Sequence, residues 1–225
     1  MIDSNLSNTP LFSALDAEAA LALQQSMVPQ TVKKGHTLFQ EGEPGDRLYV
    51  VTEGKIKLSH ASGDGRESVL MVLGPGDMFG ELSLFDPGPR TATAIAVTDS
   101  KVLGLGNTNL NPWLAGRPEV AQSLLQALAH RLRRTNETMS DLVFADVPGR
   151  VAKALLELGD KFGTKTADGM YVHHDLTQEE LAQLVGASRE TVNKALADFA
   201  SRGWLKLETR SVEILDIERL AKRAR

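Results

Sequence analysis

The chain has 225 residues, of which 42% are hydrophobic and 24% charged, and this length suffices for two modest domains with separate cores. It contains no cysteine, which excludes disulfides, thiolate metal sites, cysteine nucleophiles and cysteine-ligated iron–sulfur clusters. The net charge of −4 comes from residues 1–145, with 16 acidic and 12 basic residues, whereas residues 146–225 carry 13 of each. A nucleic-acid partner is therefore not excluded for the C-terminal part.

No apolar run approaches the roughly 18 residues that a membrane span needs. The N-terminus lacks the basic start and the apolar stretch of a secretion signal. We therefore expect a cytoplasmic protein that does not bind a membrane. The five histidines lack metal-ligand spacing, so no metal site is expected.

Short apolar segments alternate with glycine-rich turns between residues 31 and 106. The predicted strands include residues 48–51, 56–58, 68–73, 92–97 and 101–105. Many short strands separated by turn residues at near-regular spacing are typical of an antiparallel barrel or jelly roll. Residues 10–27 are predicted to be helical and to pack on the outside of this roll.

One segment of the predicted roll has the features of an anion site. Residues 79–92 predict a strand, a glycine turn, one helical turn, a Pro-Gly-Pro loop and a strand that opens with Arg90. The start of the helical turn offers N–H groups to an anion, Arg90 offers a bidentate charge, and Glu81 can accept from sugar hydroxyls. The alternative is a buried Glu81–Arg90 ion pair that braces the roll.

A long helix is predicted from residue 118 to 144, because Pro118 suits a first turn. One row of residues on it recurs at spacings of three and four, as in a two-stranded coiled coil: Leu125, Leu128, Leu132, Thr135, Met139 and Leu142. We name this row the seam and expect it to form a homodimer. Alternatively, the seam packs on the chain's own roll, although Val120, Leu124 and Ala127 form a second apolar row that suits that role.

Thr135 is the polar member of the seam. Either its hydroxyl bonds the carbonyl four residues earlier, or a polar group lies beside it.

After the seam, Asp146 can cap a new helix that has Pro148 in its first turn. This break predicts a hinge and three parts: the roll over residues 1–117, a dimerisation helix and hinge over 118–145, and a C-terminal domain over 146–225.

The most specific pattern lies between residues 175 and 216. Thr177 and Glu180 predict a capping box at the start of a short helix that ends near residue 185. Gly186 then predicts a turn, and Ser188 the cap of a second helix that ends near residue 201. Residues 204–208 and 211–215 predict a following hairpin, which makes the unit a winged helix-turn-helix.

The second helix has one apolar face, and the opposite face near its start carries Arg189, Glu190, Asn193 and Lys194. We name these four residues the recognition face. Arginine pairs with guanine, glutamate accepts from cytosine and asparagine pairs with adenine, so this set is suited to base edges in the major groove. The alternative is an ordinary helical hairpin with a solvated face.

These segments together resemble the cyclic-AMP receptor protein group of the Crp/Fnr superfamily, in the form known from actinobacteria. The resemblance covers nearly all of the chain after residue 30. It rests on EGEPGDRLY (41–49), FGELS (79–83), PRT (89–91), RLRRTN (131–136), DVPGR (146–150) and GASRETVNK (186–194). It implies an α+β fold with an N-terminal antiparallel β jelly roll that binds cyclic nucleotide, a long dimerisation helix and a C-terminal winged helix-turn-helix.

The resemblance also implies residue roles. The cyclic-AMP site comprises residues of the roll and of the long helix: Gly80, Glu81, Leu82, Ser83, Arg90, Thr91, Thr135 and Asn136. Glu81 contacts the ribose and Arg90 the cyclic phosphate, while Asn136 comes from the partner subunit. The DNA site reads a TGTGA-like half-site with residues that contact base edges or backbone: Thr177, Ser188, Arg189, Glu190, Thr191, Asn193 and Lys194.

We therefore expect a cyclic-AMP-responsive, dimeric transcriptional regulator that binds palindromic DNA to activate or repress transcription, with RNA polymerase as a further partner. The alternative is a regulator of this superfamily that answers to another ligand or binds DNA without one. Thr91 and Asn136 replace serines of the enterobacterial pattern, which leaves the nucleotide preference open, and Lys194 replaces an arginine. No enzyme is expected, because no nucleophile–base pair or phosphate loop is present.

Overall fold

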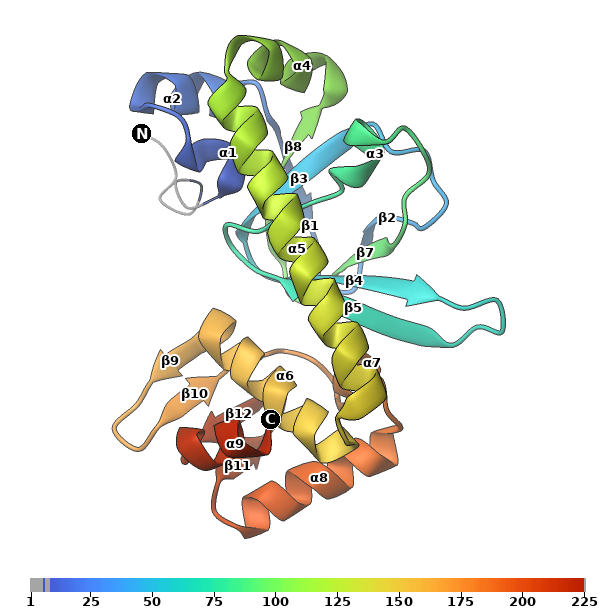
Figure 1. Cartoon of the computed structure of the whole chain (residues 1–225), viewed down its shortest axis with the longest axis vertical. Coiled ribbons are helices and arrows are strands. Elements are labelled where there is room, and N and C mark those ends of the chain that lie inside the picture. The colour runs from blue at the N-terminus through green and yellow to red at the C-terminus, as the bar shows by residue number, and fades with distance from the viewer. Residues whose placement is uncertain (1–5, 7–8, 225) are drawn as a thin grey trace. The chain divides into compact units, whose positions relative to one another are not determined.

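The computed structural model describes residue 6 and residues 9–224 (Figure 1). The chain divides into two compact units: the first comprises residues 1–62 and 70–134, and the second comprises residues 63–69 and 135–225. In the part of the chain that the structure describes, no helix is both long and apolar enough to cross a membrane.

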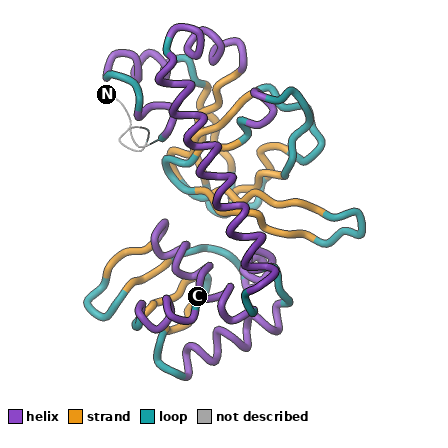
Figure 2. The backbone as a smooth tube through the Cα atoms, in the orientation of Figure 1, coloured by secondary structure: helices purple, strands orange, loops and turns teal. Residues whose placement is uncertain are grey.

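The first unit contains two four-stranded sheets, one of order β1-β8-β3-β6 and one of order β2-β7-β4-β5. Figure 2 shows these short strands alternating with loops, as predicted for the β-roll. The strands are β1 (Val28–Val32), β2 (Thr37–Phe39), β3 (Arg47–Glu53), β4 (Ile56–Ala61), β5 (Glu67–Leu73), β6 (Met78–Phe79), β7 (Thr93–Ala96) and β8 (Ser100–Gly106).

The strands predicted from the sequence are confirmed as β3, β4, β5, β7 and β8. The strand predicted at residue 79 is confirmed as β6, whereas the sequence does not predict β1 or β2. β1 lies at a sheet edge, contains Pro29 and buries only Val32, so it lacks an alternating pattern, and the missing N–H of proline is tolerated there. β2 has three residues, which is too short for a periodic pattern.

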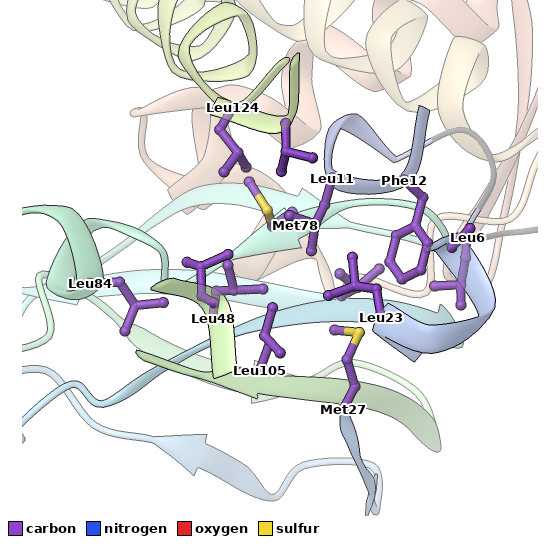
Figure 3. Packing of buried hydrophobic residues seen from close by; sticks show 14 residues of the cluster. Leu6, Leu11, Phe12, Leu23, Met27, Leu48, Met78, Leu84, Leu105 and Leu124 are labelled. Carbon is purple, nitrogen blue, oxygen red and sulfur yellow. The ribbon is translucent and has the colours of Figure 1, made fainter. Parts of the chain in front are cut away.

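The predicted helical stretch 10–27 is two helices, α1 (Pro10–Ser13) and α2 (Ala17–Gln25). Asp16 begins the second one, since its Oδ1 accepts from the Ala19 amide at 2.8 Å. Both helices pack their buried side chains onto one face of the β1-β8-β3-β6 sheet (Figure 3). This core cluster also includes Leu110 of α4 (Asn107–Gly116), a helix that the sequence does not predict.

The long helix α5 spans Pro118–Phe144, as predicted. Val120 and Leu124 are buried in the same core cluster, so the second apolar row packs on the roll. Of the seam residues in this unit, Leu125 and Leu132 are exposed, Leu132 to 62%, whereas Leu128 is half-buried and lines a cavity with Glu81. Leu125 and Leu132 therefore do not pack on the chain's own roll. Met139 and Leu142, which belong to the second unit, are exposed as well.

The second unit surrounds α6 (Val147–Phe162), which contacts α7 (Gln178–Val185), α8 (Arg189–Ser201) and α9 (Ile217–Arg223). A sheet of order β11-β12-β10-β9 completes it. Its strands are β9 (Gly163–Lys165), β10 (Met170–Val172), β11 (Leu205–Glu208) and β12 (Ser211–Ile214). The predicted helix-turn-helix and hairpin are therefore confirmed. The sequence does not predict β9, β10 or α9, because the two strands are short and the helix has a single buried residue, Leu220.

Asp146 caps α6, as predicted. Its Oδ1 accepts from the Gly149 amide at 2.9 Å, and its Oδ2 accepts from Arg223 Nη2 at 2.6 Å. Because Arg223 lies on α9, this carboxylate joins the last helix of the second unit to the start of α6. The Asp146 carboxylate thus stabilises the N-terminus of α6 both as a cap and through the interaction of its negative charge with the helix dipole.

Substitution of Gly54 should destabilise the first unit more than substitution of Gly35. Both glycines have a left-handed backbone, with φ of 81° and 79°, so alanine at either position costs about 1–2 kcal/mol. At Gly54 the added Cβ would also lie 2.4 Å from the Asp99 carbonyl oxygen, whereas nothing lies within 4 Å at Gly35. Urea denaturation of Gly54→Ala and Gly35→Ala should show the larger loss for Gly54→Ala; equal losses would contradict the packing argument.

Asp146→Asn should alter the pH dependence of stability. The hydrogen bonds from Arg223 and from the Gly149 amide lower the pKa of the Asp146 carboxyl. Its contribution to stability is therefore present above about pH 4 and is lost as the pH falls through the folded-state pKa. Between about pH 5 and 3, the free energy of unfolding of the wild type should fall more steeply than that of the variant. Arg223→Ala should flatten the profile in part; parallel profiles for all three proteins would contradict this prediction.

Candidate functional site

Arg90 is a buried cation of the first unit, with 4% of its surface exposed. Its Nη1 donates to the Gly80 carbonyl at 2.8 Å and its Nη2 to the Arg47 carbonyl at 2.9 Å. Its Nε is buried without a hydrogen-bond partner, and no carboxylate of the described residues forms an ion pair with it. Burial lowers the pKa of Arg90, yet a guanidinium stays protonated in proteins.

Aromatic rings surround the Arg90 guanidinium. The ring centroids of Phe39, Tyr49 and Phe79 lie 5.4–6.0 Å from one another. Arg90 Cζ is 4.3 Å from the Phe39 centroid and 5.7 Å from that of Tyr49, within cation–π range. Burial also raises the pKa of Tyr49, so this hydroxyl does not supply a negative charge to the cation near neutral pH.

Glu81 is fully buried and pairs with Arg131 of α5, through Oε1 and Nη1. Arg131 Nη2 also donates to the Met78 carbonyl at 2.7 Å. The Glu81–Arg90 ion pair considered from the sequence is not formed. Glu81 Oε2 is buried without a hydrogen-bond partner among the described residues, which leaves a negative acceptor open to a hydroxyl donor.

The short helix α3 (Leu82–Phe85) follows Glu81, as predicted. Ser83 is buried and Leu82 is 44% exposed. The expected strand opening at Arg90 is wrong, because β7 begins at Thr93. Arg90 instead bonds the loop before β3: its amide donates to the Glu43 carbonyl at 2.8 Å and its carbonyl accepts from the Gly42 amide at 2.9 Å. Thr91 is therefore exposed outside the regular strand.

Two cavities adjoin this segment. One of about 130 Å³ is lined by Glu81, Leu128, Arg131 and others, and one of about 830 Å³ is lined by Arg47, Ser83 and others. Neither is lined by both Glu81 and Arg90. Within the first unit, Arg90 thus bonds the Gly80 carbonyl, whereas Glu81 and Ser83 line different cavities. Thr135 and Asn136 are exposed on α5 in the second unit.

Sequence reasoning assigned no role to Arg131, although it lies in the quoted segment 131–136. Its spacing could have indicated a role at the ligand site. Arg131 precedes Thr135 by four residues, which places both residues on one face of α5.

The helix-turn-helix is held by local hydrogen bonds. The Glu180 amide donates to Thr177 Oγ1 at 3.1 Å and the Thr177 amide donates to Glu180 Oε2 at 2.7 Å, which confirms the predicted capping box. Gly186 ends α7 in the left-handed conformation. Ser188 Oγ then accepts from the Thr191 amide at 3.2 Å and begins α8.

The recognition face lies on α8 as predicted, and all of its members except the half-buried Asn193 are exposed. Lys194 Nζ lies 2.7 Å from Glu190 Oε1. Arg189 and Asn193 both donate to Gln178 Oε1, at 3.4 and 3.2 Å. Gln178 is a contact that sequence reasoning missed, because it belongs to the other helix of the motif.

Arg150 connects three parts of the second unit. Its Nη1 donates to the Ala145 carbonyl at 2.7 Å, its Nε to the Val185 carbonyl at 3.0 Å and its Nη2 to the Gly186 carbonyl at 3.2 Å. The end of α5, the start of α6 and the turn of the helix-turn-helix thus share one guanidinium. No group of three residues suited to a metal ion occurs among the residues described.

Comparisons with known proteins identify both domains. Residues 29–115 match the cyclic nucleotide-binding domain family, and residues 149–223 match the Crp-like helix-turn-helix domain family. The chain is 54% identical, over 100% of both chains, to a CRP-like cAMP-activated global transcriptional regulator of Mycobacterium tuberculosis. It is 37% identical to the cyclic AMP receptor protein of Thermus thermophilus, over 93% of this chain and 94% of that one.

A solved structure supports the same assignment. A CRP-family transcriptional regulator from Thermus thermophilus is 30% identical with a TM-score of 0.73, over 87% of this chain and 96% of that one. These relatives are transcriptional regulators rather than enzymes. The two domain families and the fold indicate the same superfamily, and the identity to the Mycobacterium tuberculosis regulator extends over the whole chain. The chain therefore belongs to the cyclic-AMP receptor protein group of the Crp/Fnr superfamily, in its actinobacterial form.

Proposed function

We propose that this chain is a cyclic-AMP-responsive homodimeric regulator of the cytoplasm, which binds palindromic TGTGA-type sites and contacts RNA polymerase there. The observation that carries the ligand assignment is Arg90, a buried guanidinium without a carboxylate partner among the described residues. A buried cation without an ion-pair partner is costly, and an anion that forks onto it with two charge-assisted hydrogen bonds offsets that cost. The cyclic phosphate of a nucleotide supplies such an anion.

The second polar end of the ligand fits Glu81. A ribose hydroxyl can donate to the open Glu81 Oε2 while Arg131 continues to neutralise the carboxylate through Oε1. Gly80, Leu82 and Ser83 present backbone and hydroxyl groups beside the phosphate, and Thr91 contacts phosphate or base. The adenine meets Thr135, and Asn136 of the partner subunit, across the seam.

Ligand binding requires a rearrangement, because neither cavity is lined by both Glu81 and Arg90. We infer that α3 or the Arg131 side chain shifts when the nucleotide binds. A ligand biases such a change only through its different affinity for the two states, typically by about 1–3 kcal/mol. In the second unit, Arg150 links the end of α5 to the helix-turn-helix and is suited to pass on a shift at residues 145–146.

The dimer is proposed from the seam. Monomeric proteins rarely expose large apolar patches, and the exposed seam residues Leu125, Leu132, Met139 and Leu142 have the spacing of a two-stranded coiled coil. A second copy buries the row by symmetry. Two recognition helices about 34–36 Å apart then match successive major grooves, with Arg189, Glu190 and Lys194 on base edges and Thr177, Ser188 and Thr191 on the backbone.

Arg90→Ala should weaken cyclic-AMP binding by at least about 100-fold, because two charge-assisted hydrogen bonds are lost. Isothermal titration calorimetry with cyclic AMP and cyclic GMP measures the loss and the nucleotide preference. Arg66→Ala is the matched control, since Arg66 Nε pairs with Asp64 on an exposed turn. Unchanged affinity in a folded Arg90→Ala protein would remove the phosphate role.

Leu132→Glu should dissociate the dimer and abolish tight operator binding, because two like charges would meet in the seam. Sedimentation equilibrium and fluorescence anisotropy with a palindromic duplex measure the two effects. Gln126→Glu adds the same charge to an exposed residue of α5 outside the seam and should leave both unchanged. A Leu132→Glu protein that stays dimeric would contradict the seam assignment.

A further inference from the structure

Gln178 lies at the first position of α7, outside the recognition face, and is exposed. Its side-chain carbonyl Oε1 is a shared acceptor: Arg189 Nη2 donates to it at 3.4 Å and Asn193 Nδ2 at 3.2 Å. Arg189 and Asn193 are four residues apart on α8 and therefore lie on one face of that helix. One oxygen of the first helix thus joins two side chains of the second.

The two helix starts fix the distance over which this bridge acts. Thr177, the residue before Gln178, is the N-cap of α7 in a capping box, and Ser188, the residue before Arg189, is the N-cap of α8. Both caps hold the backbone beside the bridging side chains. The backbone at Gln178 and at Arg189 is therefore held by local hydrogen bonds at each helix start.

Asn193 is oriented for this bridge rather than for a base. Pairing with adenine needs both the amide nitrogen and the amide oxygen at the base edge. Here Nδ2 is engaged by Gln178, and Oδ1 is buried without a hydrogen-bond partner among the described residues. Its geometry differs from that of Glu190 and Lys194, which pair with each other at 2.7 Å on the exposed surface.

A bridge of this kind matters because an arginine side chain is long and flexible. Part of the rotational entropy of its torsions is lost when the guanidinium docks on a base. A side chain that is held in its docking region before binding loses less, which improves both affinity and discrimination.

We propose that Gln178 is a positioning residue for base recognition: its carbonyl holds the Arg189 guanidinium, and Asn193 braces that carbonyl. This rests on the proposed function, in which Arg189 contacts a base edge. Gln178 then sets how strongly the protein prefers its site over other DNA without touching a base itself.

The test is a double-mutant cycle in the full-length dimer with saturating cyclic AMP. Gln178→Ala, Arg189→Ala and the double variant are compared with wild type on a palindromic TGTGA duplex and on a scrambled duplex of equal length, by fluorescence anisotropy. Gln178→Ala should lower the ratio of the two affinities by about threefold to tenfold per half-site. In the Arg189→Ala background it should have no further effect. The salt dependence should not change, since no phosphate contact is lost.

Two further variants separate positioning from folding. Gln178→Glu keeps an acceptor oxygen for both donors and should restore the affinity ratio, although its charge weakens binding to both duplexes. Glu179→Ala, at the next exposed position of α7, should leave the ratio unchanged. A ratio that is unchanged in Gln178→Ala, or that falls equally with and without Arg189, would overturn the positioning role. A ratio that is unchanged in Arg189→Ala would instead overturn the base contact assigned under the proposed function.

Discussion

The first unit is organised around a guanidinium that is enclosed between two sheets without a carboxylate partner among the described residues. Moving such an ion out of water costs several kcal/mol, so the surrounding structure must offset that cost. Two backbone carbonyls and the faces of Phe39 and Tyr49 provide the compensation in this structure. The loops that supply those groups are thereby connected to one another through the Arg90 side chain.

The second unit uses the same chemistry for another purpose. Arg150 also binds carbonyl oxygens rather than carboxylates, and its three acceptors are located where α5 ends and where the helix-turn-helix bends. Carbonyls at the ends of helices have no partner within the helix, so a cation satisfies them and interacts favourably with the helix dipole. Arg150 therefore joins the two regions whose relative movement a ligand-driven switch would use.

The parts that the sequence predicts well are those specified by local chemistry. The capping box at Thr177, the cap at Asp146 and the start of α5 at Pro118 depend on residues within one turn, and all three are present. Edge strand β1 could not be predicted, because it buries little and has no alternation.

Long-range pairings were the least predictable. Glu81 was expected to contact either a ligand or Arg90, whereas its partner Arg131 is 50 residues away on another element. Which of two arginines reaches a buried carboxylate depends on how α5 packs on the roll, and a pattern of residue types does not contain that information. The same applies to Gln178, whose partners belong to the following helix.

The wing has a property that follows from its place in the sheet. β12 pairs with β11 on one side and β10 on the other, so Val212 is opposite both Leu207 and Val172. A wing formed by a hairpin alone can fray at its tip, whereas here the central strand is closed on both edges, and β10 in turn contacts α6. We therefore expect the amide hydrogens of β12 to exchange with solvent mainly when the whole unit unfolds, with the wing as part of the domain's cooperative folding unit.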